Sequence, residues 1–425
     1  MNVFLRNKDY RKFSIASFLS GAGDILFYLA LMTYASKLKN YSLALSLIAI
    51  SESVPKVFEI FAGYLADKTK NKFRNIVWMA FSRFVLYGIV GLLLISNLNQ
   101  WNIVLAIIGI NLISDTFGSY SGGLTAPLIV NLVGEKEFGE AEGFTSGISE
   151  IINMVAQFAG ASLLLFLSYS NLAFVNAATF LIAGLLYASI GLKYRKKDQA
   201  AVKPEEVNDQ NFLATMKSSF TQLKKEHGLI TIILVIAMLN GTLGVIGALV
   251  PIVIAAHKTT MIISTYSFTI AIIGVVVSCG FILGSMFGQQ LFKKISVFTL
   301  IISAVILSAF TTIAALVANI FVILPLYFSL AVVISTASIK MTQWLVEVID
   351  RKILASSMGL LNSIIMVSSP ALTTLFTTIS GLTNVNYALL GLLGLILIVL
   401  VVASWVSMKL KQKNNLEDAD LVSEG

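Results

Sequence analysis

The stretch Gly63-Tyr64-Leu65-Ala66-Asp67-Lys68, continued by Thr69-Lys70-Asn71-Lys72-Phe73-Arg74, decides the fold of this chain. It closes one long apolar segment and precedes another. A glycine, an acid and a run of cations therefore stand between two segments that are each long enough to cross a bilayer. Because Lys and Arg are retained in cytoplasmic connections, the stretch predicts a cytoplasmic hinge between two transmembrane helices.

The composition supports a polytopic membrane protein. Of the 425 residues, 57% are hydrophobic and 12% charged, and the mean hydropathy is +0.86. Soluble domains carry about 25% charged residues. Lipid admits only helices and closed barrels, and the alternating strands of a barrel are not seen in the sequence, so we expect helices. The first span is too long for a cleavable signal peptide.

We expect an all-α membrane protein with twelve transmembrane helices in two pseudo-symmetric six-helix bundles. Apolar segments of suitable length define the spans. They are 13–36, 42–66, 76–95, 102–130, 144–167, 172–192, 229–255, 263–289, 298–317, 321–346, 355–379 and 387–408.

The cations set the orientation. Outside the spans, Lys and Arg collect at the N-terminus, in the even-numbered connections and at the C-terminus, and the opposite side holds only Lys37, Lys39 and Lys258. Both termini are therefore expected in the cytoplasm. The net charge of +8 reflects this topology and contact with lipid headgroups, and it does not indicate nucleic-acid binding.

A long polar stretch divides the chain into four expected parts. These are an N-terminal bundle at 1–192, a cytoplasmic linker at 193–227, a C-terminal bundle at 228–410 and a cytoplasmic tail at 411–425. In the linker, the apolar residues share one helical stripe, which predicts an amphipathic helix on the membrane surface or a solvated linker helix. They are Phe212, Leu213, Met216, Phe220 and Leu223.

The opening stretch resembles motif A of the major facilitator superfamily, which lies between helices 2 and 3 of those transporters. Six residues fit the motif, while Lys70 and Asn71 replace its second glycine and the following arginine. The six are Gly63, Leu65, Ala66, Asp67, Lys68 and Lys72. A weaker copy at 284–288, followed by Lys293 and Lys294, occupies the same place in the second half and lacks the acid.

Three further blocks, 126–133, 141–144 and 343–370, resemble the macrolide-efflux subfamily. That resemblance implies a proton-driven drug or macrolide exporter, an antiporter of the multidrug-resistance kind, in a bacterial plasma membrane. Three positions depart from the pattern of the family. Asn111 replaces an arginine of span 4, Gln157 replaces a proline of span 5, and Ala355-Ser356 replaces Gly-Arg before span 11.

Ionisable residues inside spans are costly, about 2.5–3.5 kcal/mol each on insertion scales, and so they mark functional positions. Asp24, Asp115 and Glu150 are the expected proton-coupling or substrate-binding acids; for the two aspartates the alternative is a structural hydrogen bond or a pair with Arg83. An intramembrane charge network is expected from five residues, of which the first three would neutralise one another on one helix face. They are Glu52, Lys56, Glu59, Arg83 and Lys340.

Motif A predicts a gate in which Asp67 pairs with a helix N-terminus or a cation in one state only; a solvated loop acid is the alternative. Gly63, Lys68 and Lys72 complete the gate. A substrate pocket is expected near the midplane between the halves. Polar and aromatic span residues could line it, although residues of this kind face lipid or the protein core more often than a ligand. They are Phe27, Tyr28, Tyr120, Gln157, Asn240, Gln343, Trp344 and Asn362.

Catalytic motifs are not found: the chain has no nucleophile elbow, Walker loop, zinc-protease motif or dinucleotide turn, so no enzyme activity and no cofactor is expected. The two histidines, His227 and His257, have no metal-ligand spacing. The expected partners are a small amphiphilic substrate, the proton and membrane lipids, and we expect a monomer. Two alternatives are a metabolite importer or uniporter, and a transporter-like lipid translocator, sensor or peptide-immunity protein.

Overall fold

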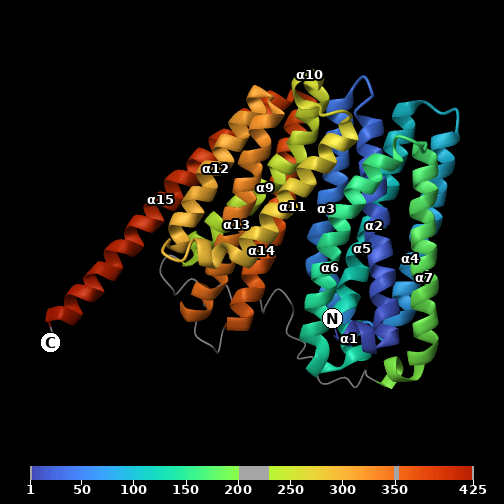
Figure 1. The fold of residues 1–425 in the computed structure, drawn as a ribbon, viewed down its shortest axis with the longest axis horizontal. Helices are drawn as coiled ribbons and strands as arrows, with labels where there is room; N and C mark the ends of the chain where they lie inside the picture. Colours follow the sequence, from blue (N-terminus) through green and yellow to red (C-terminus); the bar gives the residue numbers. More distant parts are fainter. Residues whose placement is uncertain (1, 201–228, 349–353, 424–425) are drawn as a thin grey trace. The chain divides into compact units, whose positions relative to one another are not determined.

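A computed structural model describes residues 2–200, 229–348 and 354–423. All regular structure in these ranges is helical (Figure 1), as predicted. The helices are α1 (Asn2–Arg6), α2 (Lys8–Ala35), α3 (Tyr41–Lys68), α4 (Lys72–Ile95), α5 (Gln100–Val133), α6 (Glu135–Leu163), α7 (Tyr169–Ala200), α9 (Leu229–Ala256), α10 (Lys258–Met261), α11 (Tyr266–Leu291), α12 (Val297–Val317), α13 (Ile320–Val348), α14 (Leu354–Leu382) and α15 (Val385–Ser423).

The twelve long helices correspond in order to the twelve predicted spans. Within the described ranges, eleven are long and apolar enough to cross a membrane, and α6 is the exception. It carries Glu150, Asn153 and Gln157 among its apolar residues, which lowers its hydropathy. Its length of 29 residues still exceeds the ~20 residues that a bilayer requires.

The helices begin and end at residues suited to these positions. The side chain of Asn7 accepts from the backbone N–H groups of Asp9 and Tyr10 and caps α2. Gly134 separates α5 from α6 with a φ of +82°, a conformation that glycine adopts without steric cost. The helical backbone of α15 continues through the predicted tail to Ser423, whereas the predicted amphipathic helix of the linker lies outside the described residues.

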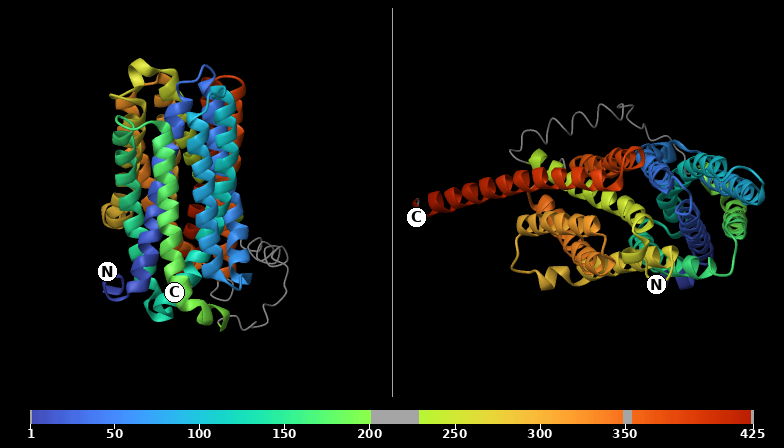
Figure 2. Two further views of the ribbon diagram at one scale, coloured as in Figure 1. Left: turned by 90° about the vertical axis from the view of Figure 1, so that its right-hand side faces the viewer. Right: turned by 90° about the horizontal axis from the view of Figure 1, so that it is seen from above.

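The chain divides into two compact units. The first comprises 1–206, 254–258 and 262–275, and the second comprises 207–253, 259–261 and 276–425. In the first unit, α7 packs against both α2 and α4, and α3 packs against α5. Figure 2 shows α2, α4 and α7 lying side by side.

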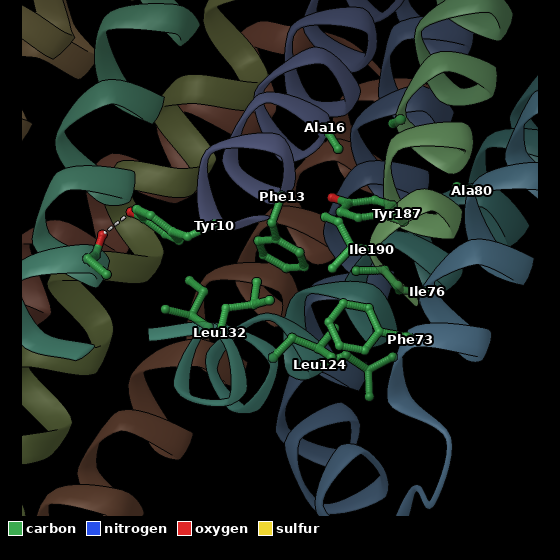
Figure 3. Packing of buried hydrophobic residues seen from close by; sticks show 14 of the residues in the cluster. Tyr10, Phe13, Ala16, Phe73, Ile76, Ala80, Leu124, Leu132, Tyr187 and Ile190 are labelled. Atoms are coloured by element: carbon green, nitrogen blue, oxygen red, sulfur yellow. Dashed lines mark hydrogen bonds between the residues drawn. The ribbon is translucent and has the colours of Figure 1, made fainter. Parts of the chain in front are cut away.

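One end of the first unit holds a core to which each of the helices α1–α7 contributes. The rings of Phe13 and Tyr187 pack at a tilt with their centroids 5.2 Å apart, and Phe73, Leu124 and Ile190 pack close by (Figure 3). The hydroxyl group of Tyr10 donates to the carbonyl oxygen of Ala141 on α6 at 2.7 Å. This core holds the ends of the helices in place next to the polar cluster described below.

Candidate functional site

Arg83 is the centre of a polar cluster inside the first unit. It lies on α4 and is only 5% exposed. Its Nη2 donates to both carboxylate oxygens of Asp24 on α2, at 2.7 and 2.8 Å, and its Nε donates to Ser114 Oγ on α5 at 2.9 Å. The ring of Phe180 on α7 lies under the guanidinium, 4.0 Å from Cζ to the centroid, in a cation–π contact. Residues of three other helices, α2, α5 and α7, therefore hold the guanidinium that α4 carries.

Asn111 joins two further acids to this centre. Its Nδ2 donates to Glu52 Oε1 on α3 at 2.9 Å and to Asp115 Oδ2 on its own helix at 2.8 Å. Its Oδ1 accepts from the hydroxyl group of Tyr87 at 2.8 Å. Asp115 Oδ1 lies 3.8 Å from Arg83 Nη2 and completes the connection. Asp24, Glu52, Arg83, Asn111 and Asp115 are called the Arg83 cluster below.

The Arg83 cluster has more acids than cations. The cluster contains one guanidinium and three carboxyl groups, so full ionisation would leave negative charge that it does not balance internally. The side chain of Arg83 is 6% exposed, whereas those of Asp24 and Asp115 are 34% and 20% exposed. The two acids are therefore more accessible than the cation that they face. Chemically, the arrangement can exchange a proton and can break or form an ion pair between α2 and α4 as it does so.

Close helix packing supports the cluster. A Cβ at Gly23 would lie 2.2 Å from Thr179 Oγ1 and 2.3 Å from Asn176 Oδ1, so only glycine allows α2 to approach α7 this closely. Phe27 is buried and packs edge-on against Tyr87, with the ring centroids 5.0 Å apart. Gly23, which precedes Asp24, thus sets the distance between Asp24 and α7. The packing of Phe27 against Tyr87 holds Tyr87 in the position from which it orients Asn111.

Of the other predicted charged residues, Lys56 acts electrostatically on Glu52 and Asp115 but forms no ion pair with them among the described residues. Lys56 and Glu59 are exposed on α3, and the ion pairs of the described residues include none between either of them and Glu52. Glu150 is exposed on α6. Lys340 lies in the second unit, where its Nζ donates to the carbonyl oxygens of Phe292 and Ile295, both at 2.7 Å.

The predicted pocket residues occupy several environments. In the first unit, Tyr28 is half-buried, Gln157 Oε1 lies where a Cβ at Gly274 would be, and the Tyr120 hydroxyl is 2.6 Å from Thr69 Oγ1. In the second unit, Asn240 donates to Ile236 O at 3.0 Å, the Trp344 ring packs edge-on against Phe298, and Gln343 is exposed. The side chain of Asn362 lies outside the described residues.

The motif A residues are described in part. Gly63 and Asp67 belong to the helical backbone of α3, but their side-chain surroundings lie outside the described residues. Lys68 is exposed, and the Nζ of Lys72 donates to the carbonyl oxygen of Thr69 at 2.7 Å. This contact ties the first turn of α4 to the hinge.

Sequence reasoning misses the residues that orient the charges. It identifies Asn111 only as a departure from the family pattern, and it does not single out Tyr87, Ser114 or Phe180. The four-residue spacing of Asn111 and Asp115 on one helix is a signal that could have found the first of these. A tyrosine or phenylalanine in a span gives no comparable signal, because these residues are common in apolar helices. Among the described residues, no group of three His, Cys, Asp or Glu could hold a metal ion.

Comparisons with known proteins agree with this architecture. The family model of the Major Facilitator Superfamily matches residues 13–370. A nucleoside transporter, NupG, is similar over 94% of this chain and 99% of its own, with a TM-score of 0.68 and 12% identity.

Two further solved structures share the fold. The peptide transporter POT, in complex with alafosfalin, is similar over 94% of this chain and 95% of its own, with a TM-score of 0.65 and 11% identity. A bacterial homologue of the iron transporter ferroportin reaches a TM-score of 0.63 at 12% identity, over 94% of this chain and 98% of its own. No curated protein matches the sequence.

Proposed function

The chain belongs to the Major Facilitator Superfamily, and from this premise we propose that it is a proton-coupled exporter of small amphiphilic molecules. Members of the family are multi-pass membrane transporters and not enzymes. We also infer that the protein works as a monomer in a bacterial plasma membrane. Both termini would lie in the cytoplasm, because the distribution of Lys and Arg outside the spans favours that orientation. Export would proceed by alternating access between the two halves.

The Arg83 cluster is the observation that carries the proton coupling. Asp24 is bound by Arg83 through both oxygens and is one-third exposed, so its ion pair can open when a proton replaces the cation as its partner. Asp115 lies 3.8 Å from the same guanidinium and can then take its place. Exchange of these partners would change the contact between α2, α4 and α5, and a proton would thereby drive a conformational change.

The substrate class rests on the resemblance of three sequence blocks to macrolide-efflux proteins. Aromatic and apolar span residues suit a lipophilic cation or a neutral amphiphile better than a sugar or a phosphate. A metabolite importer or uniporter is the second candidate. Asn111 favours this second candidate, because exporters like the macrolide-efflux proteins carry an arginine at the equivalent position. In this chain Asn111 instead donates hydrogen bonds to two acids.

Efflux of a fluorescent lipophilic cation tests the proposal. It is measured in everted vesicles for the wild type, Asp24→Asn and Asp115→Asn, with and without a protonophore. We expect the protonophore to abolish wild-type efflux and each variant to lower the rate about tenfold or more, which corresponds to ~1.4 kcal/mol in the barrier.

Glu135→Gln is the matched control, because Glu135 is an exposed acid at the start of α6, outside the Arg83 cluster. It should export at the wild-type rate. Undiminished, protonophore-sensitive efflux by both aspartate variants would remove the cluster from the coupling mechanism. Absence of wild-type efflux, together with uptake of a nucleoside or peptide by intact cells, would favour the importer.

A further inference from the structure

The first unit contains an apolar groove that the transport proposal does not use. It has a volume of about 350 Å³ and is lined by residues of α3, α4 and α5. Phe58, Phe61 and Leu65 form one wall and are 47%, 48% and 53% exposed, while Met79 and Phe117 form the other side. These residues belong to membrane-spanning helices, so an open groove of this kind meets acyl chains and not water.

One end of the groove is polar and cationic. Thr69 lines it, and the Thr69 hydroxyl lies 2.6 Å from the hydroxyl of Tyr120, which also accepts from Asn75 Nδ2 at 3.2 Å. Lys70 follows Thr69 directly, Arg74 lies in the first turn of α4, and both are exposed. The groove thus passes from an apolar wall to hydroxyl groups and then to positive charge, as an anionic amphiphile would require.

An exposed tryptophan marks the same end of α4 as a membrane interface. Trp78 is 63% exposed and lies one helical turn beyond Arg74. Tryptophan concentrates at the level of lipid headgroups. The cations of the groove therefore lie where phosphate groups of a bilayer are found.

The second unit has a groove at the corresponding place in the repeat. It lies between α11 and α13, the second and fourth spans of that half, and measures about 590 Å³. Leu283, Phe287 and Phe328 line it, and the exposed Lys293 and Lys294 follow the end of α11. Two units of one chain therefore combine the same features, an apolar groove followed by cations, at equivalent positions of the repeat.

We propose that these two grooves bind anionic phospholipids. An acyl chain occupies the apolar part, and the headgroup phosphate is bound by the adjacent cations, Lys70 and Arg74 in the first unit and Lys293 and Lys294 in the second. A zwitterionic lipid fits the grooves equally well but gains less from the cations, so the sites select for net negative charge.

Native mass spectrometry of the purified full-length protein tests this proposal. Phosphatidylglycerol and phosphatidylcholine with identical acyl chains are titrated against the wild type, Lys70→Gln/Arg74→Gln and the groove-filling variant Leu65→Trp. We expect tighter binding of phosphatidylglycerol, with two lipids bound to the wild type. Removal of Lys70 and Arg74 should lower the affinity of one of these two sites for phosphatidylglycerol about tenfold or more, and its affinity for phosphatidylcholine by less. Leu65→Trp should weaken binding of both lipids.

A control variant with the same change in charge, Lys8→Gln/Lys136→Gln, removes two exposed cations outside the segment 69–74 at the polar end of the groove. It should bind phosphatidylglycerol as the wild type does. Equal affinity for the two lipids, an equal loss in the control variant, or unchanged binding in Leu65→Trp would each overturn the proposal. Displacement of phosphatidylglycerol by glycerol phosphate alone would also overturn it, because the acyl chain would then contribute nothing.

Discussion

At the scale of single residues, the Arg83 cluster illustrates the cost of charge inside a membrane protein. The Nη2 and Nε groups of Arg83 are bonded to Asp24 and Ser114, and the face of its guanidinium is covered by Phe180. Removal of one partner of a buried ion pair costs about 3–5 kcal/mol, since the remaining charge is left uncompensated. We therefore expect Arg83→Gln to lower the free energy of unfolding by roughly that amount, measured by denaturant titration in detergent.

The double variant Arg83→Gln/Asp24→Asn should be less destabilised than the sum of its single variants, because the two residues interact directly. Arg74→Gln is the control on the same helix; Arg74 is exposed, and its loss should change the free energy by less than about 0.5 kcal/mol. Strict additivity of Arg83→Gln and Asp24→Asn would show that the ion pair does not stabilise the fold.

Sequence reasoning could identify the members of this cluster that carry charge, but not the way in which they are joined. Asp24, Glu52, Arg83 and Asp115 are visible because ionisable residues are rare in spans. Their contacts depend on which helices are neighbours and on how each helix is rotated about its axis. Neither follows from hydropathy: the spacing of Asn111 and Asp115 on one helix could have indicated their contact, but the hydrogen bond from Asn111 to Glu52 on α3 could not be predicted.

At the scale of helices, the approach of α2 to α7 depends on Gly23. A methyl group at this position would lie 2.2 Å from the hydroxyl oxygen of Thr179 and 2.3 Å from the amide oxygen of Asn176. We expect Gly23→Ala to force the helices apart and lower the free energy of unfolding by about 1–3 kcal/mol, as overpacking does in other cores. Proton-coupled efflux should fall with it, because Asp24 would be displaced from Arg83.

Gly21 offers a matched control on the same helix, since a Cβ there would meet no atom within 4 Å. Gly21→Ala should leave stability unchanged or raise it by about 0.5–1 kcal/mol, because alanine is the better helix former. Melting curves of the two purified variants decide the matter. Equal melting temperatures for both would mean that α2 and α7 do not need the close approach.

At the scale of the whole molecule, the membrane-spanning helices were largely predictable from the sequence and the contacts between them were not. Apolar segments of bilayer length identify all twelve long helices, because lipid leaves a chain of this composition no other structure. The division into compact units follows contacts instead: 254–258 and 262–275 belong with the first unit although they follow the linker. Such contacts depend on packing, which hydropathy does not report.

The helix α6 decides the topology of the whole chain. Among the long helices in the described ranges it alone lacks a stretch apolar enough to mark a span, yet an even number of spans is required for both termini to lie on one side of the membrane. We expect α6 to span the membrane, with Glu135 at its start in the cytoplasm and Ser168 after its end outside, because its 29 residues exceed the ~20 that a bilayer requires.

Reporter fusions at both termini, at Glu135 and at Ser168 test this arrangement of α6. A green fluorescent protein is fluorescent only in the cytoplasm, and alkaline phosphatase is active only outside. Fluorescence at both termini and at Glu135, with phosphatase activity at Ser168, is the expected pattern. If Glu135 and Ser168 reported the same side, α6 would lie along the surface and the termini would lie on opposite sides of the membrane. The orientation inferred from the cations would then be wrong for one half of the chain.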